Sequence, residues 1–167
     1  MKSLTLRILL FAVLTLLRCG PKQHSNEQFH GMWKLDKFEA LDTLTETWSD
    51  DSVWAKWTGY ILYDGQGHMG VHLSPPGYKD FDTNKSIDSL SDSEVKILAQ
   101  FYKSNFVYFA DYALTDTTIE HKRLSATDPT TWGRSLTRDF DFKGDTLVLT
   151  AHERIGGQKL RLRWIKL

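Results

Sequence analysis

The sequence predicts an all-β fold, in which eight antiparallel strands form an up-and-down barrel and one α-helix lies between the third and fourth strands. Three observations predict this fold. From residue 30 onward the chain contains many short runs in which apolar and polar residues alternate, separated by turn-forming residues. A single run has the 3.6-residue period of an amphipathic helix. Meandering strands in a chain of this length hide their edges most simply by closing into a barrel.

The strand candidates follow one another at short intervals. Their ranges are 32–40, 57–63, 68–73, 106–114, 118–124, 135–142, 146–152 and 159–166. Turn-forming residues fill four of the links between them, at 64–67, 115–117, 143–145 and 155–157. Neighbouring strands are therefore expected to pair as hairpins.

One helix is expected at residues 92–103. Ser91 and Glu94 have the Ser-x-x-Glu spacing of a capping box at its start. Its apolar residues lie on one face, namely Val95, Leu98, Phe101 and Tyr102. We expect this face to pack against an end or a side of the barrel.

The N-terminus has the pattern of a secretion signal. Lys2 and Arg7 precede an uncharged run at 8–17, which is too short to span a bilayer. Cys19 follows at the position where bacterial lipoproteins carry the cysteine that becomes lipidated. Arg18 stands where such signals usually have a small residue.

These features divide the chain into three parts. We expect a signal peptide at residues 1–18, a lipidated cysteine with a polar tether at 19–28, and one folded domain at 29–167. The protein is then anchored by lipid in the bacterial cell envelope, or is secreted or periplasmic if Cys19 is not lipidated. We expect the domain to be a monomer.

Composition argues against several classes of function. The chain has 21 basic and 21 acidic side chains, so we expect no nucleic-acid partner. Its single cysteine excludes an internal disulfide. On a strand, His68 and His72 are separated by about 13 Å, too far to share a metal ion, and we expect no metal. The Gly-x-Gly-x-x-Gly pattern at 65–70 joins two strands and opens no helix, so we expect no dinucleotide or other cofactor.

A family resemblance adds to this interpretation. The tripeptide Gly-Met-Trp that ends at Trp33 matches the Gly-x-Trp signature of lipocalins. Further matching residues are 59–69, the helix after the third strand, 109–112, His121, 129–133 with Trp132, Arg138 and 144–149. Together they resemble the bacterial and fungal lipocalin-like domain family over nearly all of residues 29–167. The resemblance implies a closed barrel base with Trp33 and Trp164, where Lys166 takes the place of the family's usual arginine over the Trp33 ring.

Strand parity indicates which side chains enter the barrel. Arg138 lies on the apolar face of its strand, and His121 also has inward parity. On the fourth strand two tyrosines flank the small Ala110, which leaves space in the lumen. Parity does not decide between Tyr60 and Tyr63. The candidate ligand-binding residues are Arg138, His121, Tyr108, Tyr112, Tyr63 and Phe140.

A charged group inside an apolar barrel needs a partner. Arg138 could pair with Glu39, with a buried carbonyl or with tyrosine hydroxyls. Alternatively, Arg138, His121 and one or more tyrosines could bind the carboxylate or another polar head of a small apolar ligand. Three tryptophans in or after the polar connection 41–56 could form a lid over the mouth, namely Trp48, Trp54 and Trp57.

The expected function is binding or carriage of a small apolar or amphipathic molecule in the lumen of an envelope lipoprotein. One alternative is an isomerase, cyclase or hydrolase in which His121 is the general acid or base and Arg138 holds negative charge. No second catalytic group accompanies His121. The other alternative is a ligand-free protein-interaction module, whose lumen is filled by side chains and whose aromatic rim recognises a partner.

Overall fold

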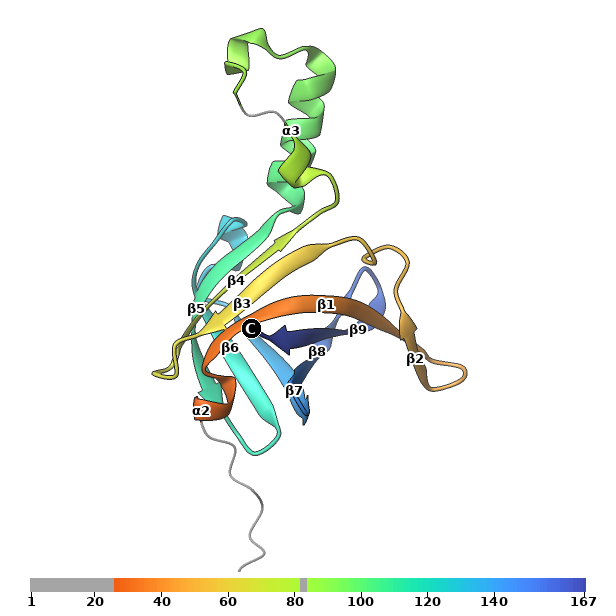
Figure 1. Ribbon diagram of the computed structural model, residues 1–167, viewed down its shortest axis with the longest axis vertical. Coiled ribbons are helices and arrows are strands. Elements are labelled where there is room, and N and C mark those ends of the chain that lie inside the picture. Colours follow the sequence, from red (N-terminus) through yellow and green to blue (C-terminus); the bar gives the residue numbers. More distant parts are fainter. Residues whose placement is uncertain (1–25, 82–83) are drawn as a thin grey trace, which may run out of the picture.

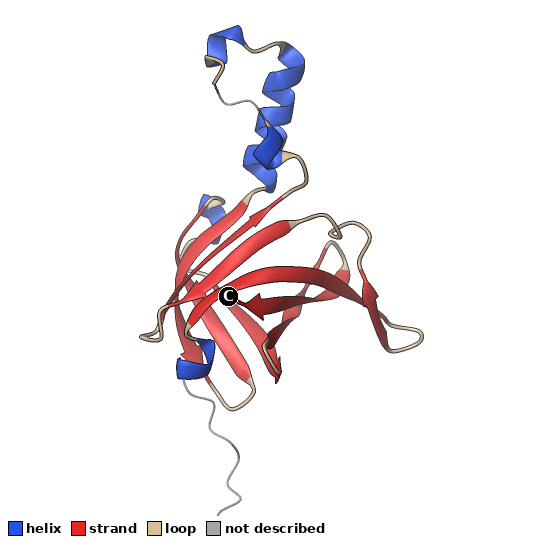
Figure 2. Ribbon diagram, in the orientation of Figure 1, coloured by secondary structure: helices blue, strands red, loops and turns tan. Residues whose placement is uncertain are grey.

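The structure is a computed structural model that describes residues 26–81 and 84–167. It shows a β-barrel with a helical arm projecting from one end (Figure 1), and strands make up nearly all of the barrel wall (Figure 2). In chain order the elements are α2 (Asn26–Phe29), β1 (Gly31–Asp42), β2 (Thr47–Asp50), β3 (Thr58–Tyr63), β4 (His68–Ser74), η1 (Tyr78–Asp80), η2 (Ile87–Ser89), α3 (Asp92–Ser104), β5 (Phe106–Leu114), β6 (Thr118–Ala126), η3 (Pro129–Thr131), β7 (Ser135–Lys143), β8 (Thr146–Ile155) and β9 (Gln158–Lys166).

Eight strands close the barrel. From β1 through β3 to β9 each strand pairs antiparallel with the next, and β9 pairs back with β1. The remaining strand, β2, pairs only with the far end of β1, where Glu39 lies opposite Asp50. It extends the sheet beyond the barrel wall. The predicted eight-stranded up-and-down barrel is confirmed, and each predicted strand overlaps one strand of the closed wall.

The predicted place of the helix in the strand order was wrong. The helix α3 lies between β4 and β5, not between the third and fourth strands of the chain. The difference arises because β2 falls in the polar connection predicted at 41–56 and adds one strand before the helix. This strand has no buried position, so no apolar alternation marks it. It is held by pairing with β1 and by the Arg161 guanidinium, whose carbon lies 4.4 Å from the centre of the Trp48 ring.

The arm that contains α3 stands away from the barrel (Figure 1). The predicted capping box is present, because the Ser91 hydroxyl accepts from the Glu94 backbone N–H and the Glu94 carboxylate accepts from the Ser91 N–H. The predicted packing against the barrel was wrong, since no residue of α3 is buried. Instead, Phe101 packs edge-on against two rings of the arm itself, Tyr78 at 5.6 Å and Phe81 at 5.8 Å.

The barrel end opposite the arm is closed by α2 (Figure 1). The Phe29 side chain is fully buried, and its ring packs edge-on against Tyr63, Phe140 and Phe142 at 5.0–5.3 Å between ring centres. Lys166 Nζ lies 5.1 Å from the centre of the neighbouring Trp33 ring, the contact that the family resemblance implies. Aromatic rings therefore fill this half of the lumen.

Helix α2 also shortens the predicted tether. Residues 26–28, the last of the tether predicted at 19–28, are helical. The rest of that tether, Cys19 and the signal peptide predicted at 1–18 lie outside the described residues.

The glycine-rich pattern at 65–70 joins β3 to β4, as predicted. The Asp64 carboxylate accepts hydrogen bonds from the backbone N–H groups of Gln66 and His68, at 2.7 and 2.9 Å. Gly65 and Gly67 have φ values of 76° and 109°, which residues with a Cβ rarely adopt. The pattern is thus a hairpin turn at the closed end of the barrel.

Candidate functional site

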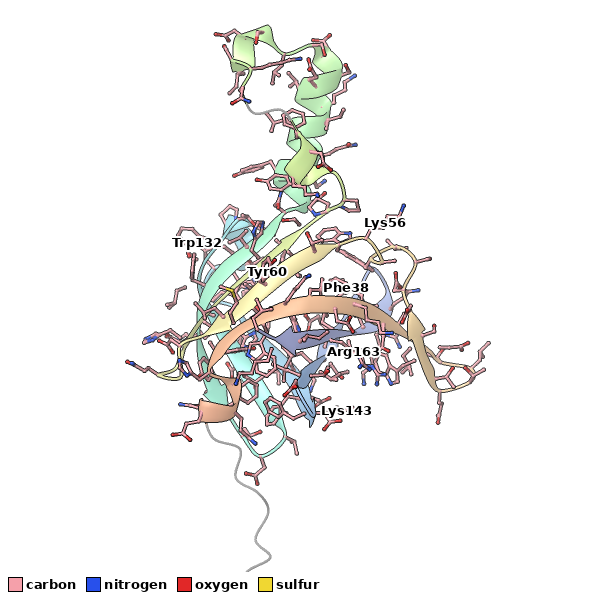
Figure 3. All side chains as sticks on the ribbon, in the orientation of Figure 1. Phe38, Lys56, Tyr60, Trp132, Lys143 and Arg163 are labelled. Carbon is pink, nitrogen blue, oxygen red and sulfur yellow. The ribbon has the colours of Figure 1, made fainter. Side chains whose placement is uncertain are left out.

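A cavity of about 250 Å³ occupies the half of the barrel nearer to the arm. Apolar side chains from β1, β3, β4, β5, β8 and β9 form most of its wall, among them Phe38, which Figure 3 labels on β1. Its polar lining residues are Ser104, Tyr108, His121, Arg123, Arg138 and Glu153. A mostly apolar pocket with a few convergent polar groups is typical of a small-molecule site.

A hydrogen-bonded bridge crosses the lumen at the floor of this cavity. The fully buried His121 on β6 has Nε2 at 3.0 Å from the Tyr63 hydroxyl on β3 and Nδ1 at 2.9 Å from the Tyr108 hydroxyl on β5. Strands β3 and β6 are not neighbours in the sheet, so the bridge spans the barrel. His121 and Tyr108 line the cavity and Tyr63 does not. The bridge therefore separates the cavity from the aromatic rings below it.

Burial keeps the bridge uncharged. Desolvation, reinforced by the charges of Arg138 and Arg123, lowers the pKa of His121 from 6.5 to about 3. Burial also raises the pKa of Tyr108 to about 12 and that of Tyr63 well above its usual value. At neutral pH the imidazole is therefore neutral, with one N–H donor and one bare acceptor nitrogen.

Arg138 is buried and lines the cavity, as its parity predicts, but its partner is not Glu39. Its two terminal nitrogens donate to the Glu153 carboxylate at 2.6 and 2.7 Å. Glu39 instead accepts from Arg161 at 2.5 Å. The physical reason is that β8 continues past residue 152, where the strand was predicted to end. Glu153 follows two residues after Ala151, which lies directly opposite Arg138.

Arg123 is the cavity residue that the sequence prediction missed. It is only 7% exposed, and its guanidinium carbon lies 5.2 Å from the Tyr108 ring centre and 5.6 Å from that of Phe106. Its Nε has no hydrogen-bond partner, and no carboxylate of the described residues lies within ion-pair distance. The alternation of inward and outward residues on β6 could have identified Arg123, since it shares the inward parity of Ile119 and His121.

The cavity therefore carries one guanidinium, that of Arg123, with no ion-pair partner among the described residues, although Glu153 and Asp128 act on it from a greater distance. Glu153 neutralises Arg138, whereas Arg123 has no such partner. Desolvation lowers the pKa of Arg123, yet a guanidinium stays protonated in proteins. Apolar walls beside an unpaired guanidinium suit an amphipathic molecule with an acceptor head.

The six predicted ligand-binding residues fall into two groups. Arg138, His121 and Tyr108 line the cavity. Tyr63, Tyr112 and Phe140 are also buried but do not line it. They lie with Phe29 in the filled half of the lumen, which the sequence pattern did not reveal because Phe29 enters from outside the strands.

Comparison with known proteins identifies the family to which the chain belongs. A family model described as Lipocalin-like domain matches residues 30–165. The chain belongs to the lipocalin-like domain family. Among solved structures, the crystal structure of a mutant of the fluorescent protein UnaG matches at 17% identity and a TM-score of 0.37, covering 84% of this chain and 96% of that one. A search of curated proteins gave no match.

In this lipocalin-like barrel, two of the three predicted lid tryptophans reach the cavity. Trp54 and Trp57 line it, with ring centres 4.6 Å apart, and Trp54 stacks on Phe38 at 5.4 Å. The buried Asp51 fixes their loop, because its carboxylate accepts from the backbone N–H groups of Val53 and Trp54. These rings form one wall of the mouth.

Three further tryptophans of the lipocalin-like domain have other positions. Trp48 lies on β2 against Arg161 and does not line the cavity. Trp132 is more than half exposed, and its indole N–H donates to the Ala126 carbonyl at 2.9 Å. Figure 3 shows it across the barrel from Lys56. Trp164, predicted as base packing, is buried and lines the cavity.

The histidines on β4 of the lipocalin-like domain point away from the lumen. His68 contacts the Asp64 carboxylate at 2.7 Å, and His72 contacts Ser74 and Asn105. Within residues 26–81 and 84–167, no group of three or more His, Cys, Asp or Glu is placed to hold a metal ion. None of the described helices has the length and apolar character needed to cross a membrane.

Proposed function

We propose that this lipocalin-like protein binds and carries a small amphipathic molecule whose anionic head contacts Arg123 in the barrel cavity. The observation that carries the proposal is the unpaired Arg123 guanidinium in the cavity wall. An uncompensated charge in apolar surroundings is unfavourable by several kcal/mol. The carboxylate of a ligand supplies the missing partner, while the apolar walls bury its body.

The size of the cavity limits the ligand. Its volume is about 250 Å³. The bridge through His121 closes its floor, and the ring of Phe29 fills the lumen below. A short-chain or single-ring carboxylate fits this space with its head beside Arg123. Octanoate is a suitable probe.

The geometry gives less support to acid–base catalysis by His121. Both ring nitrogens are engaged by tyrosine hydroxyls, and its pKa of about 3 is far from the neutral range in which a histidine exchanges protons efficiently. A ligand-free interaction module also fits less well, because the half of the lumen next to the mouth is hollow rather than filled.

The proposal places the protein in the bacterial cell envelope, anchored through a lipidated Cys19. The N-terminal sequence pattern supports this location. The first described element, α2, lies at the closed end of the barrel (Figure 1). Metabolic labelling with an alkyne fatty acid tests it. Labelling of the wild type but not of Cys19→Ala is expected, and absence of label from both contradicts the anchor.

Native mass spectrometry of the gently purified protein tests the ligand proposal. We expect a discrete added mass of a small organic acid on the wild type, and its loss from Arg123→Met. The matched control is Arg134→Met, because Arg134 is exposed outside the cavity. Equal retention by all three proteins, or retention of a cationic molecule, contradicts the proposed role of Arg123.

A further inference from the structure

Two hydrogen bonds join Tyr63, His121 and Tyr108, and their surroundings fix the direction of each bond. The two distances, 3.0 Å at Nε2 and 2.9 Å at Nδ1, are ordinary hydrogen-bond lengths. Since the imidazole is neutral, one ring nitrogen donates and the other accepts. One tyrosine therefore donates to His121, and the other accepts from it.

The buried surroundings of Tyr63 make it the donor. Its side chain is fully buried outside the cavity, among the rings of Phe29 and Tyr112. Among the described residues its hydroxyl has one hydrogen-bond partner, His121 Nε2. If Nε2 carried the proton, the Tyr63 O–H would have no acceptor, and an orphaned buried donor is unfavourable. Tyr63 therefore donates to a bare Nε2.

The proton of the imidazole is then on Nδ1, and it is donated to the Tyr108 hydroxyl oxygen. Tyr108 cannot also donate to His121, because Nδ1 has no free lone pair in this tautomer. Its own O–H has no other acceptor among the residues described. Tyr108 lines the cavity, so a ligand in the cavity can accept this proton.

We propose that Tyr108 is the hydrogen-bond donor to the ligand head, and that Tyr63 is a positioning residue that fixes this direction through the tautomer of His121. The inference rests on the proposed function and adds to it a preference for one chemical type of ligand head. Arg123 and Tyr108 both line the cavity, and the Arg123 guanidinium carbon lies 5.2 Å from the Tyr108 ring centre, so the two residues are neighbours in the cavity wall. Such a site selects heads that only accept, as a carboxylate does, over heads that must also donate, as an alcohol does.

The tautomer can be measured directly by ¹⁵N NMR of histidine-labelled protein, in which protonated and bare ring nitrogens have well-separated shifts. The His121→Gln spectrum identifies the His121 signals by their loss. We expect a protonated Nδ1 and a bare Nε2 in the wild type, with or without ligand. A protonated Nε2 overturns the inference. This readout needs no ligand and no variant of the two tyrosines.

Calorimetric titration with octanoate and with 1-octanol tests the consequence for binding. We expect Tyr108→Phe to weaken octanoate binding by about fivefold to tenfold, the usual effect of one lost hydrogen bond, and to change octanol binding less. Tyr63 does not line the cavity. Tyr63→Phe should still weaken octanoate binding severalfold, because phenylalanine cannot donate the hydrogen bond that fixes the His121 tautomer. The matched control is Tyr112→Phe, which removes a tyrosine hydroxyl from a buried residue that does not line the cavity, and which should bind like the wild type.

The two proposals fail in different ways. If the wild type binds no octanoate and Arg123→Met retains the same small molecules, the proposed function fails. The ¹⁵N NMR measurement then still tests the predicted direction of the two hydrogen bonds of His121, because it needs no ligand. If octanoate binds through Arg123 but Tyr108→Phe binds it equally well, the function stands and the donor role of Tyr108 is wrong. If Tyr112→Phe weakens binding as much as Tyr63→Phe, the effect of Tyr63 is structural and its positioning role is wrong.

Discussion

The indole N–H of Trp33 donates a hydrogen bond to the carbonyl oxygen of Phe29 over 2.8 Å. This bond ties α2 to β1 and holds the Phe29 ring inside the barrel end. The Gly-x-Trp signature that predicts a tryptophan at the base therefore also positions a second aromatic residue from outside the strands. As a result, the cavity occupies only the half of the barrel beside the arm.

Removing the Phe29 ring should strongly destabilise the fold. We expect Phe29→Ala to lower the free energy of unfolding by about 3–5 kcal/mol, because it leaves a cavity among four aromatic rings. Chemical denaturation measures this change. The control is Tyr102→Ala on the exposed face of α3, expected to change it by less than about 0.5 kcal/mol. Equal effects of the two substitutions would contradict the packing of the closed end.

The stability of the fold should fall in mild acid because of His121. Its folded pKa of about 3 lies below the ordinary value of 6.5, so between these values the unfolded chain binds the extra proton. The contribution to stability is complete above pH 6.5 and is lost as the pH falls. We expect a loss of about 2 kcal/mol between pH 6.5 and 5.

Denaturant titrations across this pH range test the assignment. His121→Gln should remove most of the slope. His68→Gln should retain it, since hydrogen bonding to Asp64 raises the pKa of His68 and its contribution is lost only as the pH rises above 6.5. Asp64 and Glu94, each with a pKa of about 2, act at lower pH. A slope unchanged in His121→Gln would show that another group is responsible.

Neutralising Glu153 should make the fold less stable and octanoate binding tighter. Glu153→Gln removes the carboxylate that pairs with Arg138, and we expect the free energy of unfolding to fall by about 1–3 kcal/mol. The cavity then carries a second unpaired charge, so octanoate should bind several times more tightly. Glu120→Gln, on the exposed face of β6, is the control. Weaker octanoate binding by Glu153→Gln would mean that the anion does not enter this charged part of the cavity.

The arm should be dispensable for the fold. No described residue from 75 to 104 is buried, and β4 and β5 are neighbouring antiparallel strands. We expect that joining Ser74 to Asn105 through a short Asn-Gly turn changes the free energy of unfolding by less than about 1 kcal/mol. Far-ultraviolet circular dichroism would confirm the loss of helix. A loss of several kcal/mol would show that the arm packs against the barrel.

The closed wall of the barrel was predictable because its strands bury one face and expose the other. The alternation around Tyr108, Ala110 and Tyr112 and around Leu160, Leu162 and Trp164 identifies the inward faces, and all six residues are buried. The helix was predictable from its capping box and its apolar period. Its packing was not, because an apolar face does not say which surface it meets.

The missed features depend on contacts between distant residues. The strand β2 is fixed by pairing with β1, and Phe29 is fixed by the Trp33 indole. Glu153 was missed as the partner of Arg138 because β8 runs three residues beyond the predicted end at 152. The inward position of Arg123 could have been predicted, since two-residue periodicity on β6 places it on the same face as His121.

The most direct test of the proposed function is the affinity of octanoate for the wild type and for Arg123→Met, measured by calorimetry beside Arg134→Met. The ion pair with a buried guanidinium contributes about 1.5–3 kcal/mol. We therefore expect Arg123→Met to bind octanoate about ten to a hundred times more weakly, and Arg134→Met to bind like the wild type. The same affinity in all three proteins would show that Arg123 does not hold an anionic ligand, and absence of binding to the wild type would exclude carboxylates of this size.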